Sequence, residues 1–344
     1  MKSIFIHSAM DLRIEDYPVE TISPNQVEIS LAIGGICGTD LHYYKHGGFG
    51  EIKLKEPMVL GHEISGYISK IGSKVTNVGL GQLVSVSPSR PCNNCVFCLE
   101  GSQNQCLNMK FYGSAMPFPH IQGAFRETLI ADDYQCIPAD GLTTGEAAMA
   151  EPLAVCLHAI NQAGNIFGKK VLITGSGPIG TLCVLAARRA GAAEIVVTDI
   201  SDTALSYSSL VGADITINSL KNYSSLEDFQ SGKGFFDVAI ECSGSESAIK
   251  DVIKCLRPKG TLVQLGLGGD ILMPLVAVTT KELNIKGSFR FHTEFQLAVQ
   301  MMQKKLIDVV PLITHTIPFN DAQKGFEIAI DNHMNSMKVQ IAFN

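Results

Sequence analysis

The chain has 344 residues, of which 46% are hydrophobic and 17% are charged, and its formal net charge is −6. This length exceeds what a single hydrophobic core usually serves, so we expect two domains. The acidic balance and the lack of any block of Lys or Arg argue against a nucleic-acid or acidic-membrane partner, and favour a small-molecule substrate.

The first residues and the longest apolar stretch indicate a cytoplasmic protein without a transmembrane segment. Residues 1–7 hold one basic residue and a short apolar run, which lacks the long apolar core of a secretory signal. The uncharged apolar stretch 171–187 is interrupted at residues 175–178 by Gly-Ser-Gly-Pro, a loop that does not suit a lipid-exposed span. We therefore expect no contact with a membrane.

Residues 1–145 are predicted to form a β-rich domain of compact barrel type. Their β-like runs, such as 26–33 and 64–71, are separated by frequent Gly and Pro. The tail, residues 288–344, contains one helix-like segment near 293–304 and cannot form a core alone, so we expect it to complete this first domain.

Between residues 146 and 287, short buried strands alternate with segments of helix length. The predicted strands are 171–174, 194–198, 236–240 and 261–265, the predicted helices 178–190 and 247–256, and the predicted turn 257–260. Repeated strand–helix units of this kind imply a parallel, doubly wound sheet. The fold class is therefore α/β, with a β-rich domain beside it.

Four of the ten cysteines lie close together in the sequence: Cys92, Cys95, Cys98 and Cys106. In a reducing compartment, four thiolates from one short loop suit a tetrahedral structural zinc ion. Disulfides and an iron–sulfur cluster are the alternatives. Five further cysteines stand in apolar surroundings and are interpreted as small buried hydrophobes: Cys136, Cys156, Cys183, Cys242 and Cys255.

A thiol, an imidazole and two carboxylates form the candidate reactive centre: Cys37, His62, Glu63 and Glu151. A catalytic zinc ion usually has three protein ligands and keeps a fourth position for water or substrate. Glu151 could bind the ion or hydrogen-bond its water. Each residue alone also has an ordinary explanation, such as packing or a solvated surface, but the set beside a four-cysteine loop favours a metal site.

Thr39 and His42 follow Cys37 by two and five residues. A hydroxyl near the metal, followed by an imidazole with an ordinary pKa of about 6.5, provides a route for a proton to reach solvent. The alternative for His42 is an exposed surface histidine.

A glycine-rich turn lies between the first predicted strand and helix of the second domain. It contains Gly175, Gly177, Pro178, Ile179 and Gly180, and these glycines permit a pyrophosphate to approach the helix N-terminus. Asp199 ends the next strand, where a carboxylate accepts hydrogen bonds from an unmodified ribose. No Lys or Arg occurs between Asp199 and Lys221, so NAD is favoured over NADP. An ordinary buried turn with a helix-capping aspartate is the alternative.

In combination, these motifs resemble the zinc-dependent medium-chain alcohol and polyol dehydrogenases over nearly the whole chain. The motifs are GICGTD at 35–40, GHE at 61–63, the cysteine loop, Glu151-Pro152 and the glycine turn. The segments 40–44 and 286–291 resemble the sorbitol dehydrogenase branch and, within it, enzymes that oxidise L-idonate.

The resemblance implies a GroES-like catalytic domain, a Rossmann domain, and two zinc ions per chain, one catalytic and one structural. Family members differ in whether the residue matching Glu63 or Glu151 touches the catalytic zinc, so both remain candidates. It also implies a substrate pocket with Tyr43 and Arg290, a homodimer or homotetramer, and further cofactor contacts from Leu265, Gly266, Leu267, Phe289 and Arg290.

The reaction that this resemblance implies is reversible oxidation of a secondary alcohol of a sugar acid or polyol to its ketone. Zinc favours the alkoxide, hydride passes to the nicotinamide, and the proton leaves through Thr39, the cofactor ribose and His42. The implied substrate is L-idonate, oxidised to 5-keto-D-gluconate. The alternatives are a neutral polyol such as sorbitol or xylitol, and a non-catalytic protein that binds NAD and zinc.

Overall fold

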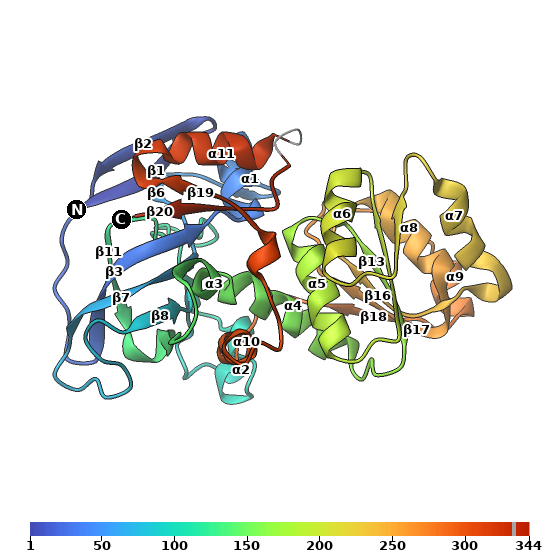
Figure 1. Ribbon diagram of the computed structural model, residues 1–344, viewed down its shortest axis with the longest axis horizontal. Helices are drawn as coiled ribbons and strands as arrows, with labels where there is room; N and C mark the ends of the chain where they lie inside the picture. Colours follow the sequence, from blue (N-terminus) through green and yellow to red (C-terminus); the bar gives the residue numbers. More distant parts are fainter. Residues whose placement is uncertain (332–334, 344) are drawn as a thin grey trace. The chain divides into compact units, whose positions relative to one another are not determined.

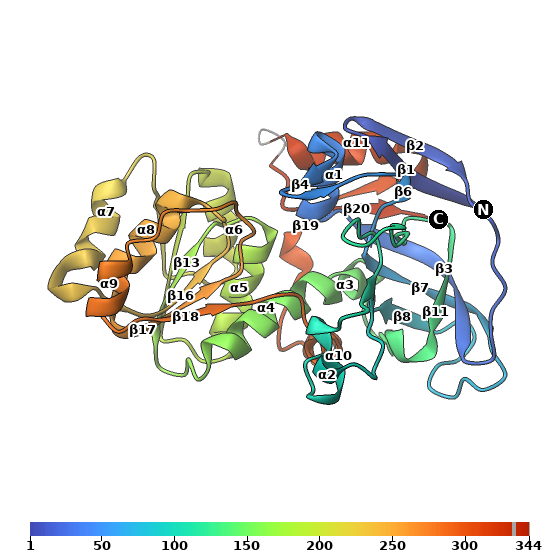
Figure 2. The same cartoon turned by 180° about the vertical axis from the view of Figure 1, so that it is seen from behind.

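The computed structural model describes residues 1–331 and 335–343, and the chain forms two compact units. The first unit comprises Met1–Glu151, Phe295–Lys305 and Ile313–Asn344, and the second comprises Pro152–Glu294 and Leu306–Leu312. Figures 1 and 2 show both units from opposite sides. Within the described ranges, none of the helices has the length and apolar character needed to cross a bilayer.

The first unit is built around β3 (Gln26–Gly35), the central strand of a seven-stranded sheet. Along one edge β3 pairs with β7 (Glu63–Ile71), and along the other it pairs first with β11 (Thr128–Asp132) and then with β20 (Lys338–Ala342). Most of β3 is buried, as its apolar sequence predicts. Residues from distant parts of the chain therefore meet along this one strand.

Smaller strands and helices complete the first unit. The remaining strands are β1 (Lys2–Ser8), β2 (Asp11–Asp16), β4 (Gly48–Phe49), β5 (Ile52–Lys53), β6 (Met58–Val59), β8 (Leu83–Val86), β9 (Ser89–Arg90), β10 (Lys110–Phe111), β12 (Cys136–Pro138) and β19 (Ile313–Pro318), and the helices are α1 (Gly38–His46), α2 (Val96–Leu99), α3 (Thr144–Ala148) and α11 (Ala322–Ile330). Helices α1 and α11 lie side by side in Figure 1 and share a core with β1 and β20, in which Ile4, Tyr44, Phe326 and Ile341 are buried.

The second unit contains a parallel six-stranded sheet in the order β15-β14-β13-β16-β17-β18. Its strands are β13 (Lys170–Thr174), β14 (Glu194–Asp199), β15 (Ile215–Asn218), β16 (Phe236–Glu241), β17 (Leu256–Gln264) and β18 (Asn284–Gly287). In chain order this is 3-2-1-4-5-6, the strand order of the dinucleotide-binding fold. The predicted doubly wound sheet is therefore confirmed.

Helices cover both faces of this sheet, as Figures 1 and 2 show. They are α5 (Pro178–Arg189), α6 (Asp202–Leu210), α7 (Tyr223–Glu227), α8 (Glu246–Cys255) and α9 (Leu275–Thr280), while α4 (Ala150–Ala163) and α10 (Glu294–Gln303) contribute to both units. The core between helices and sheet includes Leu172, Val196, Phe236 and Val252, each fully buried.

Two segments differ from the expectations. The predicted turn 257–260 lies inside β17: that strand pairs with β16 at Leu256 and again from Thr261, so the four residues between form a bulge, with Lys259 at φ 64°. We also expected all of 288–344 in the first domain, but residues 288–294 and Leu306–Leu312 cluster with the second unit. Val309 and Leu312 are buried there, and residues 310–312 contact α6.

Candidate active site

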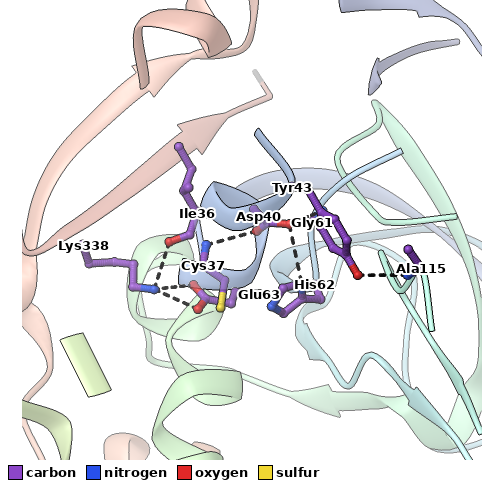
Figure 3. A network of polar contacts seen from close by, with 9 residues as sticks. All are labelled: Ile36, Cys37, Asp40, Tyr43, Gly61, His62, Glu63, Ala115 and Lys338. Carbon is purple, nitrogen blue, oxygen red and sulfur yellow. Dashed lines mark hydrogen bonds and ion pairs between the residues drawn. The ribbon is translucent and has the colours of Figure 1, made fainter. Parts of the chain in front are cut away.

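Asp40 connects the two sequence segments that supply the predicted metal ligands. It is the third residue of α1, and Cys37 is the N-cap residue of that helix. One carboxylate oxygen accepts the backbone N–H of Cys37 at 3.0 Å, and the other accepts that of Gly61 at 3.2 Å. The side chain is completely buried, and its Oδ1 lies 3.8 Å from Nδ1 of His62 (Figure 3). Asp40 thus fixes Cys37 and His62 relative to each other.

Glu63, the first residue of β7, forms a buried ion pair with Lys338, the first residue of β20. The Lys338 ammonium donates to both carboxylate oxygens at 2.7 and 2.8 Å, and to the carbonyl of Ile36 at 3.2 Å (Figure 3). A Cβ at Gly35 would lie 2.2 Å from Oε2 of Glu63, so only glycine leaves room for the carboxylate at this point of β3.

The structure brings together Cys37, His62 and Glu63, whose ligand atoms all lie within 4.8 Å of one another. Burial raises the pKa of the Cys37 thiol well above its usual value, and the Glu63 carboxylate raises it further, so a thiolate here requires a cation. Nδ1 of His62 is buried without a hydrogen-bond partner among the described residues. A thiolate, an imidazole and a carboxylate are the ligands that zinc takes in proteins, so these residues fit that ion.

The other predicted catalytic residues lie on neighbouring elements of the same unit. Glu151, near the start of α4, is buried, and its charge acts on both Cys37 and Lys338. Thr39 is partly exposed on α1, and His42 is exposed one turn further along that helix, beside His46 and Phe49. Partial burial and the neighbouring His46 and Lys45 lower the pKa of His42. Along α1, Cys37 and Thr39 are therefore partly buried, and His42 is exposed to solvent.

Tyr43, which the sequence resemblance assigns to the substrate pocket, is buried in the structure. Its side chain is 1% exposed, packs against Phe49, and accepts the backbone N–H of Ala115 at 3.0 Å through the phenol oxygen (Figure 3). Tyr43 therefore holds the chain at Ala115 in this structure, and its contact with substrate stays a prediction.

The four cysteines of the predicted structural zinc site also converge. The Sγ atoms of Cys92, Cys95, Cys98 and Cys106 all lie within 4.8 Å of one another. Hydrogen bonds from the Asn94 backbone and the Asn108 side chain lower the pKa of Cys92 to about 6, which favours a thiolate. The set has the chemistry of a closed Cys₄ zinc site.

The loop around these cysteines has little other support. Val96 and Leu99 of α2 are 53% and 75% exposed, and Leu107 is 66% exposed. The apolar side chains of this loop therefore contribute little burial, so a bound ion would be its main source of cohesion.

The glycine turn between β13 and α5 has the geometry that the sequence predicts. Gly175 has φ 86°, Gly177 is the N-cap residue of α5, and Pro178 occupies its first position. A Cβ at Gly180 would lie 1.7 Å from the carbonyl oxygen of Gly175, so the turn excludes any larger residue there. Ile179 follows Pro178 in the first turn of α5.

Asp199, at the end of β14, holds this turn in place. Its Oδ2 accepts the backbone N–H of Ser176 at 2.6 Å, and its Oδ1 accepts that of Ser201 at 2.8 Å. The basic residue that follows, Lys221, forms an ion pair with Asp202. Asp199 therefore presents a carboxylate beside the turn, and the next basic residue along the chain pairs with Asp202.

The remaining predicted cofactor contacts also belong to the second unit. Leu265, Gly266 and Leu267 directly follow β17, and Phe289 and Arg290 follow β18 after one residue. Arg290 has φ 55°, a backbone region that residues other than glycine rarely adopt, and its guanidinium carbon lies 4.8 Å from the ring centroid of Phe289. Strained residues of this kind cluster at functional sites.

Sequence reasoning missed Asp40 and Lys338 as site residues. Asp40 stands inside the GICGTD motif, and its position three residues after Cys37 is the spacing of a helix-capping carboxylate, so a signal was present. Lys338 has no local signal, because its partner Glu63 lies 275 residues earlier in the chain.

The fold and the two cysteine-containing ligand sets define a zinc-binding dehydrogenase of two units. Residues 23–141 match the family described as the alcohol dehydrogenase GroES-like domain, and residues 178–304 match the family described as zinc-binding dehydrogenase. The chain belongs to this zinc-binding alcohol dehydrogenase family and is an oxidoreductase.

Among its relatives is L-idonate 5-dehydrogenase (NAD(P)(+)) of Escherichia coli, which is 40% identical over 93% of this chain and 92% of its own. Sorbitol dehydrogenase of Bos taurus is 38% identical over 94% of this chain and 92% of its own. The crystal structure of L-idonate 5-dehydrogenase from Escherichia coli superimposes with a TM-score of 0.95, covering 99% of this chain and 97% of that one.

Proposed function

We propose that this dehydrogenase interconverts L-idonate and 5-keto-D-gluconate with NAD as the hydride acceptor. The observation that carries the reaction type is the convergence of Cys37, which is partly buried, with His62 and Glu63, which are buried, at the start of α1 and β7. Similarity to L-idonate 5-dehydrogenase over nearly the whole chain supports the substrate. In the forward direction the C5 carbon loses a hydride to NAD⁺ and the C5 hydroxyl loses a proton to solvent, giving ketone and NADH.

Cys37, His62 and a carboxylate from Glu63 or Glu151 would hold a catalytic zinc ion, which supplies Lewis acidity that lowers the pKa of a bound alcohol. Lys338 neutralises one negative charge of this buried group through Glu63. Asp40 holds Cys37 and His62 in position through the contacts of its two oxygens. Thr39 and His42 then carry the hydroxyl proton from the N-terminal end of α1 toward solvent.

Measuring the zinc content of the wild type and of two variants tests which residues bind the catalytic zinc. We propose two zinc ions per chain in the wild type, one at the catalytic set and one at the four cysteines. Glu63→Gln and Glu151→Gln should differ in how much catalytic zinc they retain, and the variant that falls to one ion per chain identifies the carboxylate ligand. A wild-type protein with a single ion at the four cysteines would contradict a zinc-dependent reaction.

Preference for NAD over NADP rests on Asp199. Its carboxylate would accept hydrogen bonds from the adenosine ribose and repel a 2′-phosphate. Asp199→Ala should lower the ratio of kcat/KM for NAD to that for NADP by about tenfold or more, which corresponds to about 1.4 kcal/mol. Asp202→Asn is the matched control, because it removes a charge three residues further on that already pairs with Lys221. An unchanged ratio in Asp199→Ala would contradict this role.

We propose that the enzyme is a homodimer that forms along β18. This strand ends the six-stranded sheet and all four of its residues are exposed, while Leu275 and Val276 of the adjacent α9 are 66% and 78% exposed. A second copy could pair with this edge and cover these side chains. Light scattering should give twice the chain mass for the wild type and a smaller mass for Ile285→Lys; a monomeric wild type would contradict the proposal.

An initial-rate screen tests the substrate. We expect higher kcat/KM with L-idonate and NAD than with sorbitol or xylitol, and reduction of 5-ketogluconate in reverse. We propose that Arg290 binds the sugar-acid carboxylate, so Arg290→Leu should impair turnover of L-idonate more than that of sorbitol. Similarity to sorbitol dehydrogenase favours the second candidate, a neutral polyol. Preference for sorbitol, unchanged in Arg290→Leu, would establish that candidate instead.

A further inference from the structure

Glu241 is a completely buried glutamate at the point where the strand order of the second unit reverses. It is the last residue of β16, and β16 lies beside β13. On one side of this pair the sheet continues through β14 to β15, and on the other side it continues through β17 to β18. In sheets of this kind, ligands bind outside the carboxyl ends of the strands at that reversal, which is where Glu241 lies.

Donors from three segments converge on the Glu241 carboxylate. Its Oε1 accepts the N–H of Ser243 at 2.8 Å, the Ser243 hydroxyl, the N–H of Gly244 at 3.1 Å and the Thr174 hydroxyl at 3.4 Å. Its Oε2 accepts the N–H of Gly244 at 2.9 Å and the side-chain amide of Gln264 at 2.7 Å. All these donors are uncharged, so Glu241 binds neighbouring loops together through hydrogen bonds.

The main chain of Glu241 adds to these connections. Its carbonyl oxygen accepts the N–H groups of Leu265 and Gly266 at 2.9 and 2.7 Å. The Gln264 amide that contacts the carboxylate also donates to the carbonyl of Gly266 at 2.9 Å. Glu241 is therefore bonded on two sides to the segment that follows β17.

The loops that Glu241 connects are packed too closely to move independently. A Cβ at Gly175 would lie 3.0 Å from the Ser243 nitrogen, and one at Gly244 would lie 2.7 Å from the Leu267 carbonyl oxygen. A Cβ at Gly266 would lie 2.3 Å from the Gly244 nitrogen. A shift of residues 243–244 must therefore displace both the glycine turn and the segment after β17.

We infer that Glu241 is a positioning residue for the dinucleotide cofactor, which holds the loops after β13, β16 and β17 in the arrangement that binds it. The inference rests on the proposed function, because it takes the cofactor to bind at these loops. Glu241 does not itself need to touch the cofactor. Its effect is transmitted through Gly175, Gly244 and Gly266, whose backbones form the carboxyl edge of the sheet.

The need for a carboxylate at this position follows from hydrogen-bond capacity. An ionised carboxyl group accepts at both oxygens, whereas an amide of the same shape accepts at one end and donates at the other. In Glu241→Gln, the amide NH₂ would face either the Gln264 amide or the N–H groups of Ser243 and Gly244. One set of buried donors would lose its partner, and the loops would separate from the strand end.

The test compares two carboxylates on the same strand. Asp237, near the other end of β16, accepts the N–H of Lys170 at 2.9 Å and pairs with Arg257 at 2.6 Å, so Asp237→Asn is the matched control for Glu241→Gln. The measurements are the Kd for NADH by fluorescence titration, KM for NAD, kcat and Tm. Gln264→Met, which removes one of the Glu241 donors and leaves the carboxylate in place, is the milder second variant.

We expect Glu241→Gln to raise the Kd for NADH and the KM for NAD by about tenfold or more, with a smaller change in kcat. Gln264→Met should show a smaller increase of the same kind, and Asp237→Asn should lower Tm without changing the Kd. Unchanged NADH binding in a folded Glu241→Gln and in Gln264→Met would overturn the inference. If Glu241→Gln does not fold, equal Kd values for Gln264→Met and Asp237→Asn would overturn it. A wild type that binds neither NADH nor NADPH would overturn the proposed function and this inference with it.

Discussion

Lys338 and Glu63 are separated by 275 residues in the sequence, and their side chains form an ion pair at 2.7 Å inside the candidate metal site. Both side chains are almost completely buried, at 3% and 1% exposure. Burial alone would lower the pKa of Lys338, but the Glu63 carboxylate more than offsets this and raises it, so the ammonium stays charged. The last described strand of the chain thereby neutralises the residue that follows His62.

Replacing Lys338 should be strongly destabilising. In Lys338→Met, the Glu63 carboxylate would remain buried without its cation, which costs about 3–5 kcal/mol in comparable cases. We expect a large fall in urea-unfolding free energy for the first unit and weaker retention of catalytic zinc. Lys70→Met is the comparison variant: its pair with Glu28 is also 2.7 Å long, but the Lys70 side chain is 61% exposed, so solvent reaches this pair, and pairs open to solvent contribute about 0–1 kcal/mol. Equal losses in both variants would contradict a special role for Lys338.

Loss of one loop cysteine should remove one zinc ion and loosen its loop. Cys98→Ser replaces a buried thiol of the four-cysteine set, and serine is a poor zinc ligand. We expect zinc content to fall from two ions per chain to one and Tm to fall by several degrees. Cys136→Ala, a buried cysteine of the same unit outside the set, should retain both ions. Two ions per chain in Cys98→Ser would exclude the four-cysteine zinc site.

Features that depend on neighbouring residues were predictable from the sequence. The strands β13, β14 and β16 follow from short apolar runs, and the turn before α5 follows from glycines that relieve local steric conflicts. The four cysteines converge because only short stretches of chain separate them. In each case the sequence itself contains the physical constraint.

Features that depend on strand pairing were not predictable in this way. Lys338 reaches Glu63 because β20 and β7 both pair with β3, and no local pattern encodes that adjacency. The hydrogen bond between Tyr43 and the backbone of Ala115, 72 residues apart in the sequence, likewise has no local signal. Leu306–Leu312 joined the second unit through buried Val309 and Leu312, although the sequence offered only a short apolar segment.

Lys281 should stabilise the second unit by capping α8. Its ammonium donates to the last carbonyl groups at the helix end, those of Ile253, Lys254 and Leu256, at 3.0, 2.7 and 2.9 Å. Partial burial lowers the pKa of Lys281, yet three acceptors and the negative end of the helix favour the charged form.

Removing this cap leaves three carbonyl oxygens without a charged donor. We expect Lys281→Met to lower the unfolding free energy by about 1–3 kcal/mol, measured by urea titration. Lys259→Met tests the simple loss of a nearby positive charge, because Lys259 is exposed and lies 3.9 Å from Glu282. The two variants should differ by at least about 1 kcal/mol. A Lys281→Met protein as stable as Lys259→Met would show that solvent replaces the ammonium at no cost.

Glu294 should make the stability of the second unit depend on acid pH. Its carboxylate accepts hydrogen bonds from His158 at 3.0 Å, Asn161 at 2.9 Å and the backbone N–H of His292 at 3.0 Å. Burial alone would raise the pKa of Glu294, but these donors more than offset it and lower the pKa to about 2. When the pKa of a carboxylate is lower in the folded protein than in the unfolded chain, the carboxylate stabilises the protein at pH values above the unfolded pKa. This stabilisation is lost as the pH falls through the folded pKa.

This stabilisation should be lost between pH 4.5, the ordinary pKa of glutamate, and about pH 2, the pKa of Glu294 in the folded protein. At neutral pH the full effect is up to about 3 kcal/mol, since one pKa unit corresponds to about 1.4 kcal/mol. Glu294→Gln cannot titrate, so its Tm deficit relative to wild type should be constant above pH 5 and should shrink between pH 5 and pH 3.5. Glu282→Gln, at an exposed position, should show no such trend. A deficit for Glu294→Gln that stays constant down to pH 3.5 would mean that Glu294 holds its proton equally well in the folded and unfolded chain.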